Sequence, residues 1–153
     1  MPELNQAAPD FSMFDHERKR VSLADLRGTK VILAFYPAAF TGVCEKEMCT
    51  FQSSLTALND ANAKVFGVSV DAPFANAAFA AQNGIAFGLL SDYDRSAVSA
   101  YGIAHDDFAG MPGYTVAKRS VFVIDENGQL TFKWVADNPG QEPDYAAVLA
   151  AVA

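Results

Sequence analysis

The stretch from Lys30 to Phe51 constrains the fold of this chain more than any other part of the sequence. It starts with an apolar run at residues 31–35, which is typical of a buried strand. Pro37 has no amide hydrogen to donate to a sheet ladder, so the strand must end there. Helix-forming residues follow a potential cap at Thr41. The stretch therefore predicts a strand, a short loop and a helix, with Cys44 in or beside the first helical turn.

A cysteine at this place is suited to reactivity, because the start of a helix stabilises a thiolate. An ordinary thiol has a pKa of about 8.5, and keeping one ionised at neutral pH takes roughly 3.4 kcal/mol of extra stabilisation. A helix N-terminus contributes about 0.3–1 kcal/mol, and up to ~2 kcal/mol when partly buried. Glu45 and Glu47 oppose a neighbouring negative charge. A guanidinium at about 4 Å would contribute on the order of 4 kcal/mol, so we expect an arginine beside Cys44.

The remaining segments predict one α/β domain over residues 1–153. The helix is expected to run without a break from Cys44 to about Asn59, and an apolar strand at 64–70 completes a parallel βαβ unit. Cys44 then lies at the carboxyl end of the strands, where such units bind ligands. The other expected elements are an N-terminal β-hairpin of residues 8–13 and 19–23, a turn of helix capped by Ser22, a helix at 74–82, a strand at 86–90, a helix at 95–101, a loop at 106–116, a hairpin of 120–124 and 130–135, and a helix opened by Pro143.

Composition limits the classes of partner. The chain has 153 residues and is 51% hydrophobic, which is enough to bury a core without disulfides. Its longest apolar runs are short for a membrane span, and the first residues lack a basic and apolar leader pattern, so we expect a soluble cytoplasmic protein. The net charge is −7 and the 11 basic residues are scattered, which argues against nucleic acid as a partner. The one basic cluster, residues 18–20, is interpreted as a solvated turn.

The two cysteines and two histidines do not form a metal site. Zinc sites need several ligands at short spacing, whereas His16 and His105 each stand alone. The chain also has no C-x-x-C, so a dithiol reductase of thioredoxin type is not indicated. The cysteines are therefore interpreted as redox residues or buried apolar filler.

Pro37, Thr41 and Cys44 form the pattern P-x-x-x-T-x-x-C between a strand and a helix, which resembles the peroxidatic motif of the peroxiredoxins. Glu47, three residues beyond the cysteine, occupies a position that is also glutamate in many members of that family. The resemblance extends over essentially the whole chain. It implies a thioredoxin-like α/β fold with a central mixed sheet, flanking helices and an N-terminal hairpin, and a reaction that needs no metal, haem or flavin.

The arginine can be chosen from the expected topology. If the strand at 120–124 pairs antiparallel with the strand at 31–36, its first residue lies at the same edge as Cys44, and Arg119 immediately precedes it. The active-site arginine of the family also precedes this strand, so the resemblance assigns that role to Arg119. Lys118 is the competing cation, but lysine lacks the planar fork of donors that a guanidinium has.

The resemblance implies a peroxidase mechanism. The Cys44 thiolate would attack hydrogen peroxide or an organic hydroperoxide and become a sulfenic acid. Arg119 and the Thr41 hydroxyl would hold the two peroxide oxygens, Pro37 would shield the thiolate, and Glu47 could orient Arg119. A thioredoxin-like or glutaredoxin-like protein would supply the reducing thiols.

Three readings of the second cysteine and of the activity stay open. The Cys44-x-x-x-x-Cys49 spacing is similar to the Q-type branch, in which Cys49 would resolve the sulfenic acid as an intramolecular disulfide. On an intact helix the two Cα atoms would lie about 8.7 Å apart, whereas a disulfide needs roughly 4.4–6.8 Å, so the helix would have to open. The loop sequence at residues 39–41 is more similar to branches that use one cysteine or resolve it elsewhere, and Cys49 would then be core filler. A non-catalytic redox sensor of thioredoxin fold is the third reading.

Three aromatic residues also bear on assembly. Phe40, Phe74 and Phe108 are expected in loops around the site, and exposed aromatic residues grouped in this way are typical of an interface. The sequence therefore predicts a homodimer.

Overall fold

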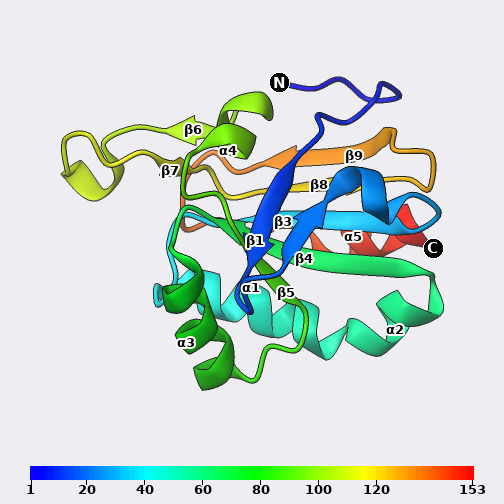
Figure 1. Ribbon diagram of the computed structural model, residues 1–153, viewed down its shortest axis with the longest axis horizontal. Coiled ribbons are helices and arrows are strands. Elements are labelled where there is room, and N and C mark those ends of the chain that lie inside the picture. Colours follow the sequence, from blue (N-terminus) through cyan, green and yellow to red (C-terminus); the bar gives the residue numbers. More distant parts are fainter.

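The computed structural model describes residues 1–153 and contains one large and one small β-sheet (Figure 1). The strands are β1 (Ser12–Asp15), β2 (Arg20–Ser22), β3 (Lys30–Phe35), β4 (Ala63–Ser69), β5 (Gly88–Ser91), β6 (Ala104–His105), β7 (Val116–Ala117), β8 (Ser120–Ile124) and β9 (Leu130–Val135). The large sheet has the order β2-β1-β5-β4-β3-β8-β9, and β6 pairs with β7 separately. β3 is parallel to β4 and antiparallel to β8, so the sheet is mixed.

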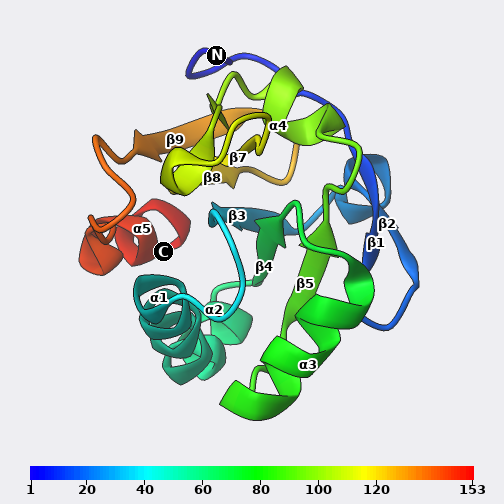
Figure 2. The same ribbon diagram turned by 90° about the vertical axis from the view of Figure 1, so that its left-hand side faces the viewer.

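Helices cover both faces of the large sheet. They are η1 (Leu23–Leu26), α1 (Gly42–Ser53), α2 (Leu55–Asp60), α3 (Pro73–Asn83), α4 (Ser96–Ala100), η2 (Phe108–Gly110) and α5 (Tyr145–Val152). Figure 2 shows α1, α2, α3 and α5 on one side of the sheet and α4 on the other. None of these helices combines the length and the apolar character that crossing a membrane would require.

The central strand β3 supplies side chains to two hydrophobic cores, because successive residues of a strand point to opposite faces. Val31, Leu33 and Phe35 belong to the core under α4. Ile32 and Ala34 belong to the core under α1, α2, α3 and α5. All five side chains are almost completely buried. A strand buried on both faces reads as a continuous apolar run, which explains why its sequence shows no polar alternation.

The α/β class, the parallel β3–α1–β4 unit and the N-terminal hairpin are confirmed. The hairpin of β8 and β9 has the bounds expected from the sequence. Phe35 pairs with Ser120, which places the start of β8 at the end of β3, as predicted. Most other elements begin or end within one or two residues of their expected positions, although β1 starts only at Ser12 and β5 only at Gly88. The single-domain organisation over residues 1–153 stays a prediction.

The expectation of one helix from Cys44 to Asn59 is wrong. The helix is divided at Ser54, whose ψ of 3° lies outside the helical range. The Ser53 hydroxyl donates to the Thr50 carbonyl at 2.7 Å and the Ser54 hydroxyl donates to it at 3.3 Å. Serine side chains that bond the backbone in this way compete with the helical hydrogen bonds.

Two other local expectations need correction. The Ser22 side chain makes no capping bond to η1 and instead donates to the Ser12 hydroxyl at 3.0 Å. The C-terminal helix begins at Tyr145 rather than at Pro143, because the Asp144 carboxylate caps it by accepting from the Ala147 amide at 3.2 Å. Neither change moves the elements around Cys44.

Gly67, in the middle of β4, allows α1 to approach the sheet closely. A Cβ atom there would lie 2.6 Å from Leu89 Cδ2, 2.9 Å from Met48 Sδ and 3.1 Å from Tyr36 Cε1. We expect Gly67→Ala to lower the free energy of unfolding by about 1–3 kcal/mol, because overpacking forces these side chains apart. Urea denaturation measures the change. Gly42→Ala is the control, since its Cβ would meet no atom within 4 Å. Equal midpoints for Gly67→Ala and wild type would contradict the expectation.

Candidate active site

Cys44 lies in the first turn of α1, where the chain enters the helix from the end of β3. Its side chain is completely buried and its thiol is free. Thr41 occupies the N-cap position, and its carbonyl accepts from the Glu45 amide at 3.0 Å. The sequence predicted that the Thr41 hydroxyl could cap the helix, but it makes no capping bond. It donates instead to the Ala38 carbonyl at 2.9 Å. Thr41 is therefore held to its own loop, beside the start of α1.

The structure brings Arg119 and Cys44 together. Arg119 is only 2% exposed, and its Nη2 donates to Cys44 Sγ at 3.0 Å. Its Nε donates to the Pro139 carbonyl at 3.0 Å, so the guanidinium is anchored on a second side. Lys118, the competing cation, has an exposed side chain and no hydrogen bond or ion pair to either cysteine. The register of β8 on β3 thus positions the arginine, as the sequence predicted.

Glu47 is the third member of this buried group. Its side chain is fully buried one turn after Cys44, and Arg119 Nη1 donates to Glu47 Oε1 at 3.5 Å. The second carboxyl oxygen, Oε2, has no hydrogen-bond partner. Burial raises the pKa of Glu47 from 4.5 to about 8, although the neighbouring Arg119 lowers it and offsets part of the effect. Burial therefore favours the protonated form of Glu47, while Arg119 bonds both Glu47 and the Cys44 sulfur.

A cavity of about 230 Å³ opens beside this group. Its lining is mostly apolar and comes from the loop after β3, the start of α1, η2 and the segment after β9, with Arg119 in its wall: Pro37, Thr41, Gly42, Val43, Phe108, Arg119, Pro139 and Gly140. Pro37 contributes to this wall, and its role in shielding the thiolate stays a prediction. Phe108 was expected near the site, and it lies in η2 with its side chain in the cavity wall. Pro139 was not predicted to line the cavity, because the segment after β9 carries no periodic pattern that would place it there.

Cys49 lies apart from the buried group. It is exposed, and its closest polar contact is 4.0 Å from Sγ to Asn83 Oδ1. The possibility that it is core filler is wrong, because the core does not cover it. Cys44 and Cys49 both lie within the intact helix α1, one buried and one exposed, and they are not joined.

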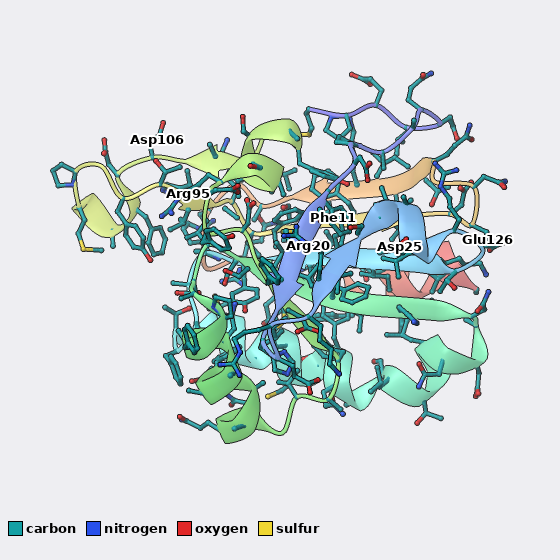
Figure 3. All side chains as sticks on the ribbon, in the orientation of Figure 1. Phe11, Arg20, Asp25, Arg95, Asp106 and Glu126 are labelled. Carbon is teal, nitrogen blue, oxygen red and sulfur yellow. The ribbon has the colours of Figure 1, made fainter.

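The basic cluster of the N-terminal hairpin does not contribute to the site. Arg20, labelled in Figure 3, lies on β2 with its guanidinium 4.4 Å from the centre of the Phe14 ring. It also donates to the Ser12 hydroxyl at 2.9 Å. The Arg18 guanidinium lies 5.4 Å from the centre of the Phe74 ring. Both arginines therefore contact nearby aromatic rings rather than the buried thiol.

Comparisons with known proteins agree with this geometry. The model of the AhpC/TSA family matches residues 4–133. A protein of Mycobacterium tuberculosis that is named as a peroxiredoxin is 42% identical over 125 residues, which cover 80% of this chain and 78% of that protein. A thiol peroxidase of Streptococcus sanguinis is 36% identical over 152 residues, or 98% of this chain and 88% of that protein. The crystallised bacterioferritin comigratory protein of Xanthomonas campestris, described for alkyl peroxide reduction, superposes with a TM-score of 0.82 at 26% identity, over 93% of this chain and 89% of that one.

The raised pKa of Glu47 predicts a specific dependence of stability on pH. Because its proton is held more tightly in the folded chain than in the unfolded chain, this contribution is full below pH 4.5 and is lost as the pH rises through about 8. We expect Glu47→Gln, which has no proton to lose, to remove that loss between about pH 4.5 and about pH 8. Urea unfolding at several pH values measures the difference between the two curves. Glu45→Gln, on the same helix but partly exposed, should give a curve parallel to wild type. Parallel curves for Glu47→Gln and wild type would show that the buried carboxyl does not titrate in this range.

Proposed function

The chain belongs to the AhpC/TSA family of peroxiredoxins, and on that premise we propose that Cys44 is its peroxide-reducing cysteine. It has the thioredoxin-like fold of this family and is a thiol peroxidase that reduces hydroperoxides. The observation that carries the assignment of Cys44 is the 3.0 Å contact between its sulfur and the buried guanidinium of Arg119. A buried cation stabilises the thiolate that the reaction needs.

The reaction follows from what surrounds the sulfur. The thiolate attacks the terminal oxygen of the hydroperoxide, the S–O bond forms as the O–O bond breaks, and the leaving oxygen takes a proton and departs as water or an alcohol. Arg119 stabilises the charge that moves onto the leaving oxygen. The Thr41 hydroxyl and the Cys44 amide lie at the start of α1, where backbone amides lack helical partners, and they hold the peroxide in line.

The shape of the cavity supports organic hydroperoxides as substrates beside hydrogen peroxide. Val43, Phe108 and Pro139 give the roughly 230 Å³ space an apolar wall next to Arg119. An alkyl group held against that wall leaves water, whereas the peroxide end faces the guanidinium and the thiol. The substrate class therefore includes peroxides with a small apolar substituent.

Cys49 is proposed to resolve the sulfenic acid in the same chain. Its exposure makes it available to a reductant, and its position in α1 requires that the helix open before the two sulfurs meet. Lys46 of α1 pairs with Glu142 at 3.1 Å, and the buried ring of Phe51 meets the ring of Tyr145 edge to face at 5.5 Å. The ion pair contributes little because Lys46 is mostly exposed, whereas opening the first turns must also release the buried Cys44 from Arg119.

The resulting disulfide would be reduced by a thioredoxin-like or glutaredoxin-like protein. A one-cysteine enzyme would instead have its sulfenic acid reduced directly by an external thiol. A redox sensor of the same fold would be oxidised once without turnover. The cytoplasmic location expected from the sequence stays a prediction.

Replacement of each cysteine tests the function and the resolving step together. Cys44→Ser should abolish peroxide consumption, because a hydroxyl cannot take the oxygen. After one equivalent of peroxide, wild type should form a Cys44–Cys49 disulfide with loss of helical circular dichroism. Cys49→Ser should stop at the sulfenic acid and then accumulate sulfinic acid. Mass spectrometry and stopped-flow kinetics measure these outcomes.

Different results would contradict the role proposed for Cys44 and the role proposed for Cys49. More than a tenth of wild-type activity in Cys44→Ser would remove Cys44 from the mechanism. Equal turnover of wild type and Cys49→Ser with a small external thiol would instead make this a one-cysteine peroxidase. Each variant is a single-atom change from sulfur to oxygen, so folding is preserved and the comparison is direct.

We propose that the chain forms a homodimer through exposed aromatic residues. Fewer of these residues are exposed than the sequence predicted. Phe40 is 48% exposed and Phe74 is 67% exposed. Phe74 lies in α3 rather than in a loop. Phe108 lies beside the cavity, as expected, but it belongs to η2 and is partly buried, so it adds less to an exposed face. We expect sedimentation at tens of micromolar to show a dimer that Phe74→Ser weakens. A 16.4 kDa species alone would contradict the proposal.

A further inference from the structure

A buried cluster of polar side chains lies between the end of β3, the end of β4 and the first turns of α3. Tyr36, Ser69 and Asn76 are all completely buried, and the Tyr36 hydroxyl donates to Asn76 Oδ1 at 2.7 Å. The Asn76 amide in turn donates to Ser69 Oγ at 3.3 Å. Burial raises the pKa of Tyr36, so its hydroxyl keeps its proton and stays a donor. Buried polar groups are normally hydrogen-bonded, and the side chains of this cluster are hydrogen-bonded to one another.

The cluster ends on Asp71, which faces the loop between β3 and α1. Ser69 Oγ donates to Asp71 Oδ2 at 2.8 Å, and the backbone amide of Ala39 donates to the same oxygen at 2.8 Å. The Ser91 hydroxyl donates to the Asp71 carbonyl at 2.6 Å and fixes its backbone. Two serine hydroxyls therefore hold Asp71 in place, and its carboxylate accepts from the Ala39 amide in the middle of the loop.

That loop has few other restraints. Pro37 offers no amide donor, and Phe40 has a φ of 66°, in the left-handed region that residues with a side chain adopt rarely. The Phe40 ring packs edge to face on Phe79 of α3 at 5.4 Å. The Thr41 hydroxyl bonds only within the loop, to the Ala38 carbonyl. The Asp71 carboxylate is consequently the polar side chain that ties this loop to the rest of the fold.

We propose that Asp71 is a positioning residue of the peroxidase site, which holds the Ala39 amide and thereby places the Thr41 hydroxyl and the start of α1 against Arg119. The inference rests on the function proposed for Cys44. It concerns the alignment of peroxide rather than the ionisation of the thiol, because Asp71 bonds the loop whereas Arg119 bonds the sulfur. Misplacement of a reacting group by about 1 Å can lower a rate by about two orders of magnitude.

Two substitutions at Asp71 separate positioning from general stability. Asp71→Ala removes the acceptor of the Ala39 amide. Asp71→Asn keeps an oxygen that can accept from both the Ala39 amide and the Ser69 hydroxyl. We expect the second-order rate constant with peroxide to fall about tenfold or more in Asp71→Ala, and to stay within about threefold of wild type in Asp71→Asn. Alkylation of Cys44 by iodoacetamide, which has no O–O bond to align, should stay within about twofold of wild type in both variants.

Several results would overturn the inference. These are a peroxide rate in Asp71→Ala close to wild type, a loss in Asp71→Asn equal to that in Asp71→Ala, or a proportional loss of alkylation and peroxide rates. If Asp71→Ala does not fold, Ser69→Ala removes the hydroxyl that orients the same carboxyl oxygen and should lower the peroxide rate about threefold with alkylation unchanged. A wild-type rate in Ser69→Ala would then reject the proposal.

The same measurements distinguish this failure from failure of the proposed function. A wild-type protein whose Cys44 does not react with peroxide overturns the function, and the positioning role with it. A reactive wild type with an equally reactive Asp71→Ala overturns the positioning role alone.

Discussion

The buried guanidinium of Arg119 is the group on which the arrangement of the site depends. Taking a cation out of water costs several kcal/mol unless partners replace the lost hydration. Each of the three nitrogens of the Arg119 guanidinium donates to a different partner: the Cys44 sulfur, the Glu47 carboxyl and the Pro139 carbonyl. Of the two acidic partners, burial keeps Glu47 mostly neutral. One buried side chain therefore holds these three parts of the site together.

The sequence was informative wherever local patterning decides structure. The apolar run at 31–35 and the hairpin of β8 and β9 could be located because their periodicity and turn residues agree. Arg119 could be placed because strand register carries a residue at the start of β8 to the end of β3. The motif of Pro37, Thr41 and Cys44 then identified the chemistry.

The remaining features depend on contacts that no local pattern encodes. The Ser54 break arises from serine hydroxyls bonding one carbonyl, while the helical periodicity of the apolar residues continues through it. The bond between Asp71 and the Ala39 amide joins two loops 32 positions apart. The complete burial of Glu47 depends on the packing of α1 in the folded chain, which the residues around it in the sequence do not show. These contacts depend on tertiary packing, so they can be identified only from the folded structure.

The division of the helix at Ser54 separates the hydrogen bonds of α1 from those of α2. Helix formation is cooperative, and melting spreads along an unbroken hydrogen-bonded ladder. Here the ladder that contains both cysteines is only 12 residues long, and a non-helical residue separates it from α2. The side chain of Leu58 keeps α2 in the core on the other side of that boundary. The disulfide proposed between Cys44 and Cys49 would therefore cost the order of one short segment and leave α2 in place.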